Sequence, residues 1–347
     1  MRIVITGATG NVGTALLQAL AEDVKGPHQI VGISRRPAPA EPPYHGVEWR
    51  SADLATPESA TVLAEACAGA DAVVHLAWLI QPSRDRELLR RTNQDGTARV
   101  IEAVRRAGVG QLVHFSSVGV YSPAHDPRPV SEDYPHEGVP SSPYSVDKAA
   151  AERLLDRFEA ESAATTVTRL RPALILQAAA ASEIARYFLP RPLPTGLLRP
   201  GLLRLVPFPA GVGVQFVHAR DVARAVLLVL HERAGGAFNV ATDRVVNRQS
   251  WRAMFGGVGP PLPVPVLRSL ARASWAAHLQ PVDPGWIDLA ANVPILSTDR
   301  IRQLGWRPER TVEQLLREFL QALRDGRGTA SPALAPRGRP AGAVGAS

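Results

Sequence analysis

Short apolar runs alternate with helical patterns over the first half of the chain. The runs are rich in β-branched residues and apolar throughout, as in parallel strands that are buried on both faces of a sheet. The predicted strands are 2–6, 29–33, 47–50, 72–76, 111–115 and 166–170, and the predicted helices are 14–23, 57–66, 95–106 and 144–161. This alternation of strand and helix predicts an α/β fold with a doubly wound parallel sheet.

The regular alternation stops after residue 172. Residues 190–209 are rich in Pro, Leu and Arg, which favours an irregular lobe or flap. A strand and helix at 215–230 and a strand at 237–240 return to the earlier pattern. The last predicted helix is 311–323, and from Gly326 onward the chain contains mainly Gly, Ala, Pro and Arg. A segment of that composition buries too little apolar surface to fold, so we expect a disordered tail.

These changes in pattern divide the chain into domains. We expect a main domain at residues 1–171 that is rejoined by about 215–245, a smaller mixed lobe formed by 172–214 and 246–325, and a disordered tail at 326–347.

The composition is that of an ordinary globular protein. The chain has 347 residues, 45% of them hydrophobic and 20% charged, which excludes a small disulfide-stapled module and general disorder. No apolar run approaches the ~18 residues that span a bilayer, and the chain begins directly with a strand and glycines rather than a signal peptide. We therefore expect a cytoplasmic protein without a membrane segment. The single cysteine, Cys67, cannot form an internal disulfide.

The formal net charge is +7, and whether it indicates a nucleic-acid partner depends on where the excess basic residues lie. Three arginines without any acid lie in 190–214, and three more lie in 326–347. These two segments carry six of the seven excess charges, so the rest of the chain is nearly neutral. An extended face for nucleic-acid phosphates is therefore not expected.

A glycine-rich turn joins the first predicted strand to the first helix. Glycines let the backbone turn sharply and approach a pyrophosphate, and the start of the following helix offers free N–H groups. The alternative is a glycine-rich turn with no ligand. The residues of the turn that we expect to bind a dinucleotide are Gly7, Thr9, Gly10, Asn11, Val12 and Gly13.

The second predicted strand is followed by Ser34, Arg35 and Arg36. A site for NAD places a carboxylate here to accept the ribose 2′-hydroxyl, whereas the 2′-phosphate of NADP needs hydroxyl and guanidinium donors. The sequence therefore favours NADP over NAD. The alternative is that both arginines lie in a solvated turn.

Tyr144 and Lys148 lie four residues apart in a predicted helix, so their side chains share one face. An ammonium group beside a phenol lowers the pKa of the tyrosine from its reference value of ~10. Such a tyrosine can exchange a proton with a substrate hydroxyl or carbonyl. The alternative is an ordinary exposed pair, but Lys148 is one of only two lysines in the chain.

Ser116 and Ser117 follow the predicted strand 111–115. Ligands of open α/β sheets bind at the carboxyl ends of strands, and a serine there can hydrogen-bond the same oxygen that Tyr144 protonates.

These motifs occur in a characteristic order. The set also includes the pairs Asp53-Leu54 and Leu76-Ala77, Asn93, Arg171-Pro172, the run Phe216-Val217-His218 with Asp221, and Leu304-Gly305-Trp306. Over roughly residues 1–325 the chain resembles the extended short-chain dehydrogenase/reductases, the NAD-dependent epimerase/dehydratase family. The resemblance implies a Rossmann-type domain with a smaller C-terminal substrate domain, and it is compatible with a homodimer.

The resemblance also implies roles for individual residues. It makes Ser117, Tyr144 and Lys148 the catalytic residues, with Lys148 also holding the nicotinamide ribose. It places Asp53 and Leu54 on the adenine side, Leu76 and Ala77 along the cofactor, and Asn93 as a support of the active-site helix.

Departures from the family pattern narrow the reaction. Dehydratases carry an Asp-Glu pair where this chain has Val118-Gly119, so dehydration is not expected. Sugar-nucleotide epimerases usually have an aromatic-Asn run after the sixth strand and an arginine where this chain has Gln215. The Arg171-Pro172 version is more similar to the reductase branch.

We therefore expect an NAD(P)-dependent oxidoreductase that moves hydride to or from a small-molecule substrate, with Tyr144 as general acid/base. The largely apolar segment 188–212 favours a hydrophobic or modestly polar substrate over a doubly charged one. Two alternatives remain: a sugar-nucleotide epimerase that retains NAD tightly, and a non-catalytic NADP-sensing or interaction protein. The nine histidines show no close pair or ligand spacing, so we expect no metal site.

Overall fold

The centre of the structure is a seven-stranded parallel sheet. The computed structural model describes residues 1–36, 38–81, 83–124, 126–189, 208–209, 211–257 and 262–336. The strand order is β3-β2-β1-β4-β5-β6-β9. The chain adds β2 and β3 on one side of β1 and then crosses to the other side for β4 and the later strands, as in a doubly wound fold. The strands are β1 (Arg2–Thr6), β2 (Gln29–Ser34), β3 (Glu48–Ser51), β4 (Ala72–His75), β5 (Gln111–Phe115), β6 (Thr166–Pro172) and β9 (Gly236–Val240).

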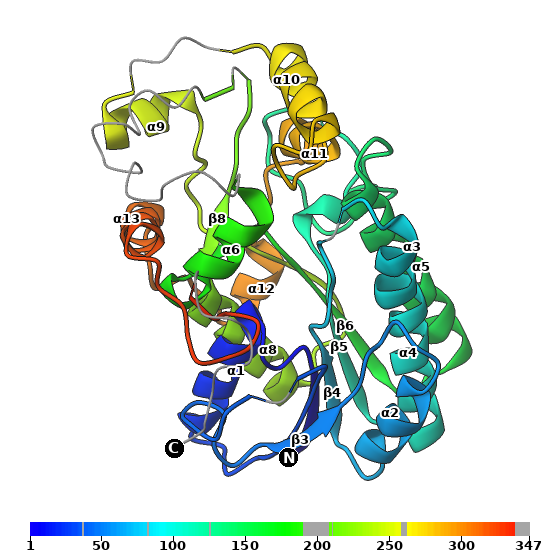
Figure 1. Ribbon diagram of the computed structural model, residues 1–347. Coiled ribbons are helices and arrows are strands. Elements are labelled where there is room, and N and C mark those ends of the chain that lie inside the picture. The colour runs from blue at the N-terminus through cyan, green and yellow to red at the C-terminus, as the bar shows by residue number, and fades with distance from the viewer. Residues whose placement is uncertain are drawn as a thin grey trace.

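Helices cover both faces of this sheet (Figure 1). Helices α1 (Asn11–Ala21) and α8 (Ala219–Glu232) lie on one face, and α2 (Ser59–Cys67), α4 (Gly96–Ala107) and α5 (Pro143–Glu161) lie on the other. Each face has its own apolar core, because the strand residues alternate between the two sides. The three-layer arrangement confirms the predicted α/β class with a Rossmann-type parallel sheet.

One predicted strand lies outside the main sheet. The residues after Gln215 form β8 (Phe216–His218), which pairs in parallel with β7 (Leu174–Leu176) in a separate two-stranded sheet. The sequence showed a buried strand here but could not show which strand it pairs with.

A second group of helices forms the smaller lobe, and α9 (Arg248–Phe255), α10 (Val264–Ala276) and α11 (Gly285–Asn292) lie far from β3 (Figure 1). An apolar cluster joins β7 to α9 and to two further helices, α6 (Ala181–Phe188) and α13 (Val312–Arg324). The predicted irregular segment 190–209 lies mostly outside the described residues. The remaining helical segments are α3 (Arg86–Arg90), the π-helical η1 (Arg91–Asp95), η2 (Val118–Val120), η3 (Ala178–Ala180) and α12 (Asp299–Gln303).

The prediction of a disordered tail was wrong for residues 326–336. This segment leaves α13 and runs beside α1 (Figure 1), and the side chains of Ser331 and Leu334 are fully buried. The Ser331 hydroxyl donates a hydrogen bond to the carbonyl of Thr9 (2.6 Å). Arg186 of α6 donates to the carbonyls of Ala333 and Ala335. Composition did not predict the order of this segment, because the order comes from polar contacts with the rest of the fold. Residues 337–347 of the predicted tail lie outside the described residues.

We expect Ser331→Ala to destabilise the protein by about 1–3 kcal/mol, because the buried Thr9 carbonyl loses its donor. Urea-induced unfolding measures this change. Ser269→Ala is a suitable control, since the Ser269 hydroxyl contacts only a neighbouring carbonyl on an exposed helix. Equal stability of the two variants would contradict a structural role for the 326–336 segment.

No helix within the described ranges is both long and apolar enough to cross a membrane. The predicted cytoplasmic location and the absence of a nucleic-acid partner stay predictions.

Candidate active site

The glycine-rich turn lies at the carboxyl end of β1, and two of its glycines are required by close backbone contacts. Gly7 has φ +72°, and a Cβ there would lie 2.7 Å from the backbone nitrogen of Ala77. At Gly13, a Cβ would lie 2.5 Å from the carbonyl oxygens of Ala8 and Gly7. Helix α1 then begins after Gly10, and no side chain caps it. Its first N–H groups are therefore available to an anion, as a pyrophosphate site needs.

Three other predicted residues of the turn have defined positions. The Asn11 side chain donates to the carbonyl of Ile175 (3.3 Å) and accepts from Gln177 (2.8 Å), so it ties the turn to β7. Val12 packs partly buried against the core under α1. Thr9 is buried and is held by Ser331.

An open pocket of about 320 Å³ lies at the carboxyl ends of β2 and β3. Arg35 and Asp53 both line it, so the fold brings together two residues that were predicted to hold the adenosine half of a dinucleotide. The Ser34 hydroxyl donates to the carbonyl of Arg36 (2.8 Å), so its proton is already engaged. Of the three predicted 2′-phosphate ligands, Arg35 is the one whose side chain lines the pocket; Arg36 is exposed.

Hydrogen bonds also fix four other residues that were predicted to lie along the cofactor: Asp53, Leu54, Leu76 and Ala77. The carboxylate of Asp53 accepts from the backbone of Ala55 (2.9 Å), and the Leu54 carbonyl accepts from Arg99 (2.8 Å). After β4, the backbone N–H groups of Leu76 and Ala77 both donate to Thr6.

Asn93 lies in the π-helical segment η1 and fixes the chain that follows β4. Its side-chain oxygen accepts from the Leu79 N–H (2.7 Å), and its amide nitrogen donates to the Leu79 carbonyl (2.9 Å). This two-way contact supports the position of the neighbouring Trp78.

Ser117 and Tyr144 meet where β5 ends and α5 begins. The Ser117 oxygen accepts from the Gly119 N–H (3.0 Å), and the Ser117 hydroxyl and the Tyr144 ring both lie against Gly119. Gly119 allows this approach, since a Cβ there would lie 3.1 Å from the Tyr144 ring. Burial raises the pKa of Tyr144 to about 12, and the neighbouring Ser117 hydroxyl offsets part of that rise. The phenol is therefore protonated at neutral pH.

Lys148 is buried one turn further along α5. Its ammonium group donates to the carbonyl of Phe115 (2.7 Å) and lies 3.4 Å from the centre of the Trp78 ring. Burial holds the pKa of Lys148 well below its usual value, although Glu152 and Asp147 oppose that shift. In this conformation the Lys148 ammonium group turns to Phe115, and its effect on the pKa of Tyr144 stays a prediction.

Aromatic side chains surround the Tyr144 phenol. The Trp286 ring of α11 lies 4.8 Å from the Tyr144 ring, and Phe188 of α6 contacts Trp286 edge-on at 4.9 Å. Trp78 meets Tyr144 edge-on at 6.3 Å. A Cβ at Gly285 would lie 2.7 Å from the Ser141 carbonyl, so a glycine is needed for α11 to lie against the start of α5. We call Trp78, Tyr144, Phe188 and Trp286 the aromatic wall.

Glu152 of α5 supports the segment that carries Ser116 and Ser117, and the sequence analysis did not single it out. Its carboxylate is fully buried and accepts a hydrogen bond from the Ser116 hydroxyl. It also forms an ion pair with Arg171, accepting from the Nε and Nη2 atoms of that side chain. Arg171 also donates to Tyr121 (3.1 Å) and to the carbonyl of Glu132 (2.8 Å). A glutamate two turns after Tyr144, facing the strand that carries Arg171, was the available signal.

The comparisons with known proteins agree with the fold. The NAD dependent epimerase/dehydratase family matches residues 3–241. The chain therefore belongs to this family, and its fold is that of an extended short-chain dehydrogenase/reductase. A solved relative, a short-chain dehydrogenase/reductase superfamily protein from Agrobacterium tumefaciens with bound NAD, is 26% identical with a TM-score of 0.66; the match covers 94% of this chain and 98% of that one.

Curated relatives include both a reductase and an epimerase. The 2-alkyl-3-oxoalkanoate reductase of Stenotrophomonas maltophilia is 33% identical over 50% of this chain and 51% of its own. The UDP-glucose 4-epimerase of Mycolicibacterium smegmatis is 32% identical over 46% of this chain and 51% of its own. The chain spans between 30% and 51% of the length of these and the other first relatives that it matches.

The residues present fit a dinucleotide. The positions at Gly7 and Gly13 have no room for a side chain, the start of α1 is uncapped, and the pocket with Arg35 lies at the ends of the next two strands, β2 and β3, along the same sheet edge. A dinucleotide is an elongated ligand with its pyrophosphate at the first helix, which this spacing accommodates.

Proposed function

We propose that this protein is a nicotinamide-dependent reductase of carbonyl compounds, with NADP favoured over NAD. The observation that carries the proposal is the meeting of the Ser117 hydroxyl and the Tyr144 ring beside Gly119, at the carboxyl edge of the sheet that also carries the glycine-rich turn. When bound, the nicotinamide supplies hydride to a carbonyl carbon, and the protein must supply a proton to the oxygen.

Tyr144 is the proton donor in this proposal. Its neutral phenol donates to the carbonyl oxygen as negative charge develops there. The Ser117 hydroxyl stabilises the same oxygen by a second hydrogen bond. Lys148 then favours the phenolate that remains, provided that its ammonium group turns from Phe115 toward Tyr144. Trp78 lies over that ammonium group, so it must shift for a ribose hydroxyl to reach Lys148.

The aromatic wall supports a substrate with an apolar body. Rings that pack at these distances favour flat or hydrophobic groups over a hydrated diphosphate. Lys148 is the cation that contacts the wall, over Trp78, and three arginines of neighbouring elements have other partners: Arg84 stacks on Trp275, Arg86 pairs with Asp147, and Arg268 pairs with Asp288. This is the observation that favours a reductase over a sugar-nucleotide epimerase.

The experiment that tests the proposal incubates the purified chain with NADPH and each of three probes: an aryl ketone, a medium-chain 3-oxo ester and UDP-glucose. Net NADPH oxidation with either of the first two supports the reductase. Oxidised NAD that stays bound through dialysis, and that converts UDP-glucose to its epimer without added NADPH, would support the epimerase instead. Binding of NADPH without turnover of any probe would favour the cofactor-sensing alternative.

We expect replacement of Arg35 and Arg36 by alanine to weaken NADP binding by roughly 10–100-fold, because charge-assisted hydrogen bonds to a phosphate are lost. NAD lacks the 2′-phosphate, so its affinity should change little. Titration of tryptophan fluorescence with each cofactor measures both constants. Arg50→Ala is the matched control, because Arg50 lies on neighbouring β3 and pairs with Glu48. Equal losses for NAD and NADP would remove the 2′-phosphate assignment.

A further inference from the structure

A second cluster of ligand-type side chains lies at the opposite edge of the sheet from the glycine-rich turn. Asp23 follows the end of α1, His28 precedes β2, and His231 lies in the last turn of α8. The sequence analysis expected no metal site, because no two histidines are close along the chain. The fold changes this picture, since it brings Asp23 to His231 across 208 positions.

The three side chains converge on one point. The Nε2 atom of His28 lies 2.7 Å from Oδ2 of Asp23, and the Nε2 atom of His231 lies 2.9 Å from the same oxygen. All three ligand atoms lie within 4.8 Å of one another. The exposed fractions of the side chains are 5% for Asp23, 2% for His28 and 13% for His231, so the group is sheltered from solvent.

We propose that Asp23, His28 and His231 form a binding site for a zinc ion. Two imidazoles and one carboxylate are a donor set that suits Zn²⁺ and other late first-row metals, and it is unsuited to Mg²⁺ or Ca²⁺, which prefer oxygen ligands. Ligand atoms of a tetrahedral zinc are roughly 3.3 Å apart, given Zn–N and Zn–O bonds of about 2.1 Å. The Asp23 oxygen must therefore lie about half an ångström further from each imidazole nitrogen than it does without the ion.

The same three atoms serve both arrangements. Oδ2 of Asp23 lies within hydrogen-bond distance of Nε2 of His28 and of Nε2 of His231, so a zinc ion shared by these atoms would replace both hydrogen bonds with metal–ligand bonds.

A simple hydrogen-bonded trio is the competing explanation. Nδ1 of His28 is buried and has no partner among the described residues in either arrangement, so this atom does not separate the two explanations. Zinc titration separates them, because a hydrogen-bonded trio alone binds no metal.

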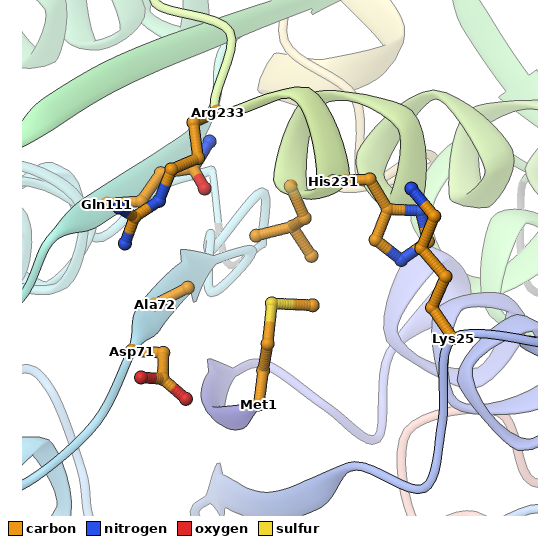
Figure 2. Close-up of a pocket in the computed structure, with 8 residues that line it drawn as sticks. Met1, Lys25, Asp71, Ala72, Gln111, His231 and Arg233 are labelled. Carbon is orange, nitrogen blue, oxygen red and sulfur yellow. The ribbon is translucent and has the colours of Figure 1, made fainter.

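Three protein ligands leave the fourth position of a tetrahedral zinc to water. An open pocket of about 440 Å³ lies beside His231, lined by the starts of β1, β4 and β5 (Figure 2). Figure 2 shows His231 and Lys25 on one side of this pocket, with Met1 and Asp71 across from them. Lys25 and Arg233 carry positive charge that opposes a cation. We therefore expect a weaker site than a centre with four protein ligands. Its role is to tie the ends of α1 and α8 to β2, away from the reaction site.

The test uses the full chain after dialysis against a chelator. The protein is titrated with ZnCl₂, and bound zinc and the midpoint of thermal unfolding are measured. We expect one equivalent of zinc per chain and a higher midpoint with zinc, because the ion binds the folded state. MgCl₂ should give neither effect. Cobalt should give the visible absorption of a tetrahedral site with nitrogen and oxygen ligands.

Variants locate the site. Asp23→Asn and, separately, His231→Gln should lower zinc affinity by at least roughly tenfold and abolish the thermal shift, with circular dichroism checking that each variant is folded. His45→Ala is the matched control, since His45 is exposed and lies outside this cluster. The proposal would be overturned if the parent chain bound no zinc in the titration. It would also be overturned if Asp23→Asn, His231→Gln and the parent had the same zinc affinity. Neither result bears on the reductase assignment, because the two sites lie at opposite edges of the sheet.

Discussion

Tyr144→Phe should lower turnover by about 10²–10⁴-fold, because the carbonyl oxygen then has no proton donor beyond Ser117 and water. The ring of phenylalanine keeps the contacts with Trp286 and Trp78, so the aromatic wall should stay in place. Steady-state rates with NADPH and the best carbonyl probe measure the loss. Cofactor affinity should stay near that of the parent, since the phenol contacts Ser117 and the aromatic wall rather than the glycine-rich turn.

Tyr134→Phe is the control for this variant. The Tyr134 hydroxyl donates to the carbonyl of Pro123, away from Ser117, so its loss should leave turnover nearly unchanged. If Tyr144→Phe turned over at the parent rate, the acid/base assignment would be refuted. If it lost cofactor binding in equal measure, the effect would be on the shape of the site and not on proton transfer.

Glu152→Ala should destabilise the protein by about 3–5 kcal/mol, because it leaves the Arg171 guanidinium buried without its counter-ion. Ser116 also loses its acceptor, which loosens the chain that carries Ser117. Urea-induced unfolding measures the change. Glu87→Ala is the control: Glu87 pairs with Arg90 on an exposed face, so the free energy of unfolding should hardly change.

The contribution of Glu152 should also depend on pH. Burial tends to raise the pKa of Glu152, but the hydrogen bonds and charge of Arg171 hold it below its usual value. The folded state therefore favours the ionised carboxylate, and the stabilisation is present above the usual carboxyl range and is lost as the pH falls. A Glu152→Ala variant as stable as the parent at neutral pH would contradict a structural role for this ion pair.

The parts of the site that follow local rules were visible in the sequence. Gly7 and Gly13 were recognisable because a dinucleotide turn imposes its spacing within one strand and helix. Tyr144 and Lys148 were recognisable because four residues in a helix set their relation. The sheet was predictable because parallel strands buried on both faces are apolar throughout.

Contacts between distant segments were not visible. Trp286 reaches Tyr144 only because Gly285 lets α11 pack against the start of α5, and nothing near Trp286 in the chain shows this. The pairing of β8 with β7 and the burial of Ser331 likewise depend on partners far along the chain. The pKa of Tyr144 depends on the depth of burial, which spacing along a helix does not report.

The most direct test of the central claim follows deuterium from NADPH labelled at the transferred position into the product of the most active carbonyl probe. The account predicts that the label appears on the carbinol carbon, one atom for each NADPH oxidised, in the parent protein. Product that carries no label, or a labelled cofactor recovered unchanged beside an epimerised sugar nucleotide, would contradict it.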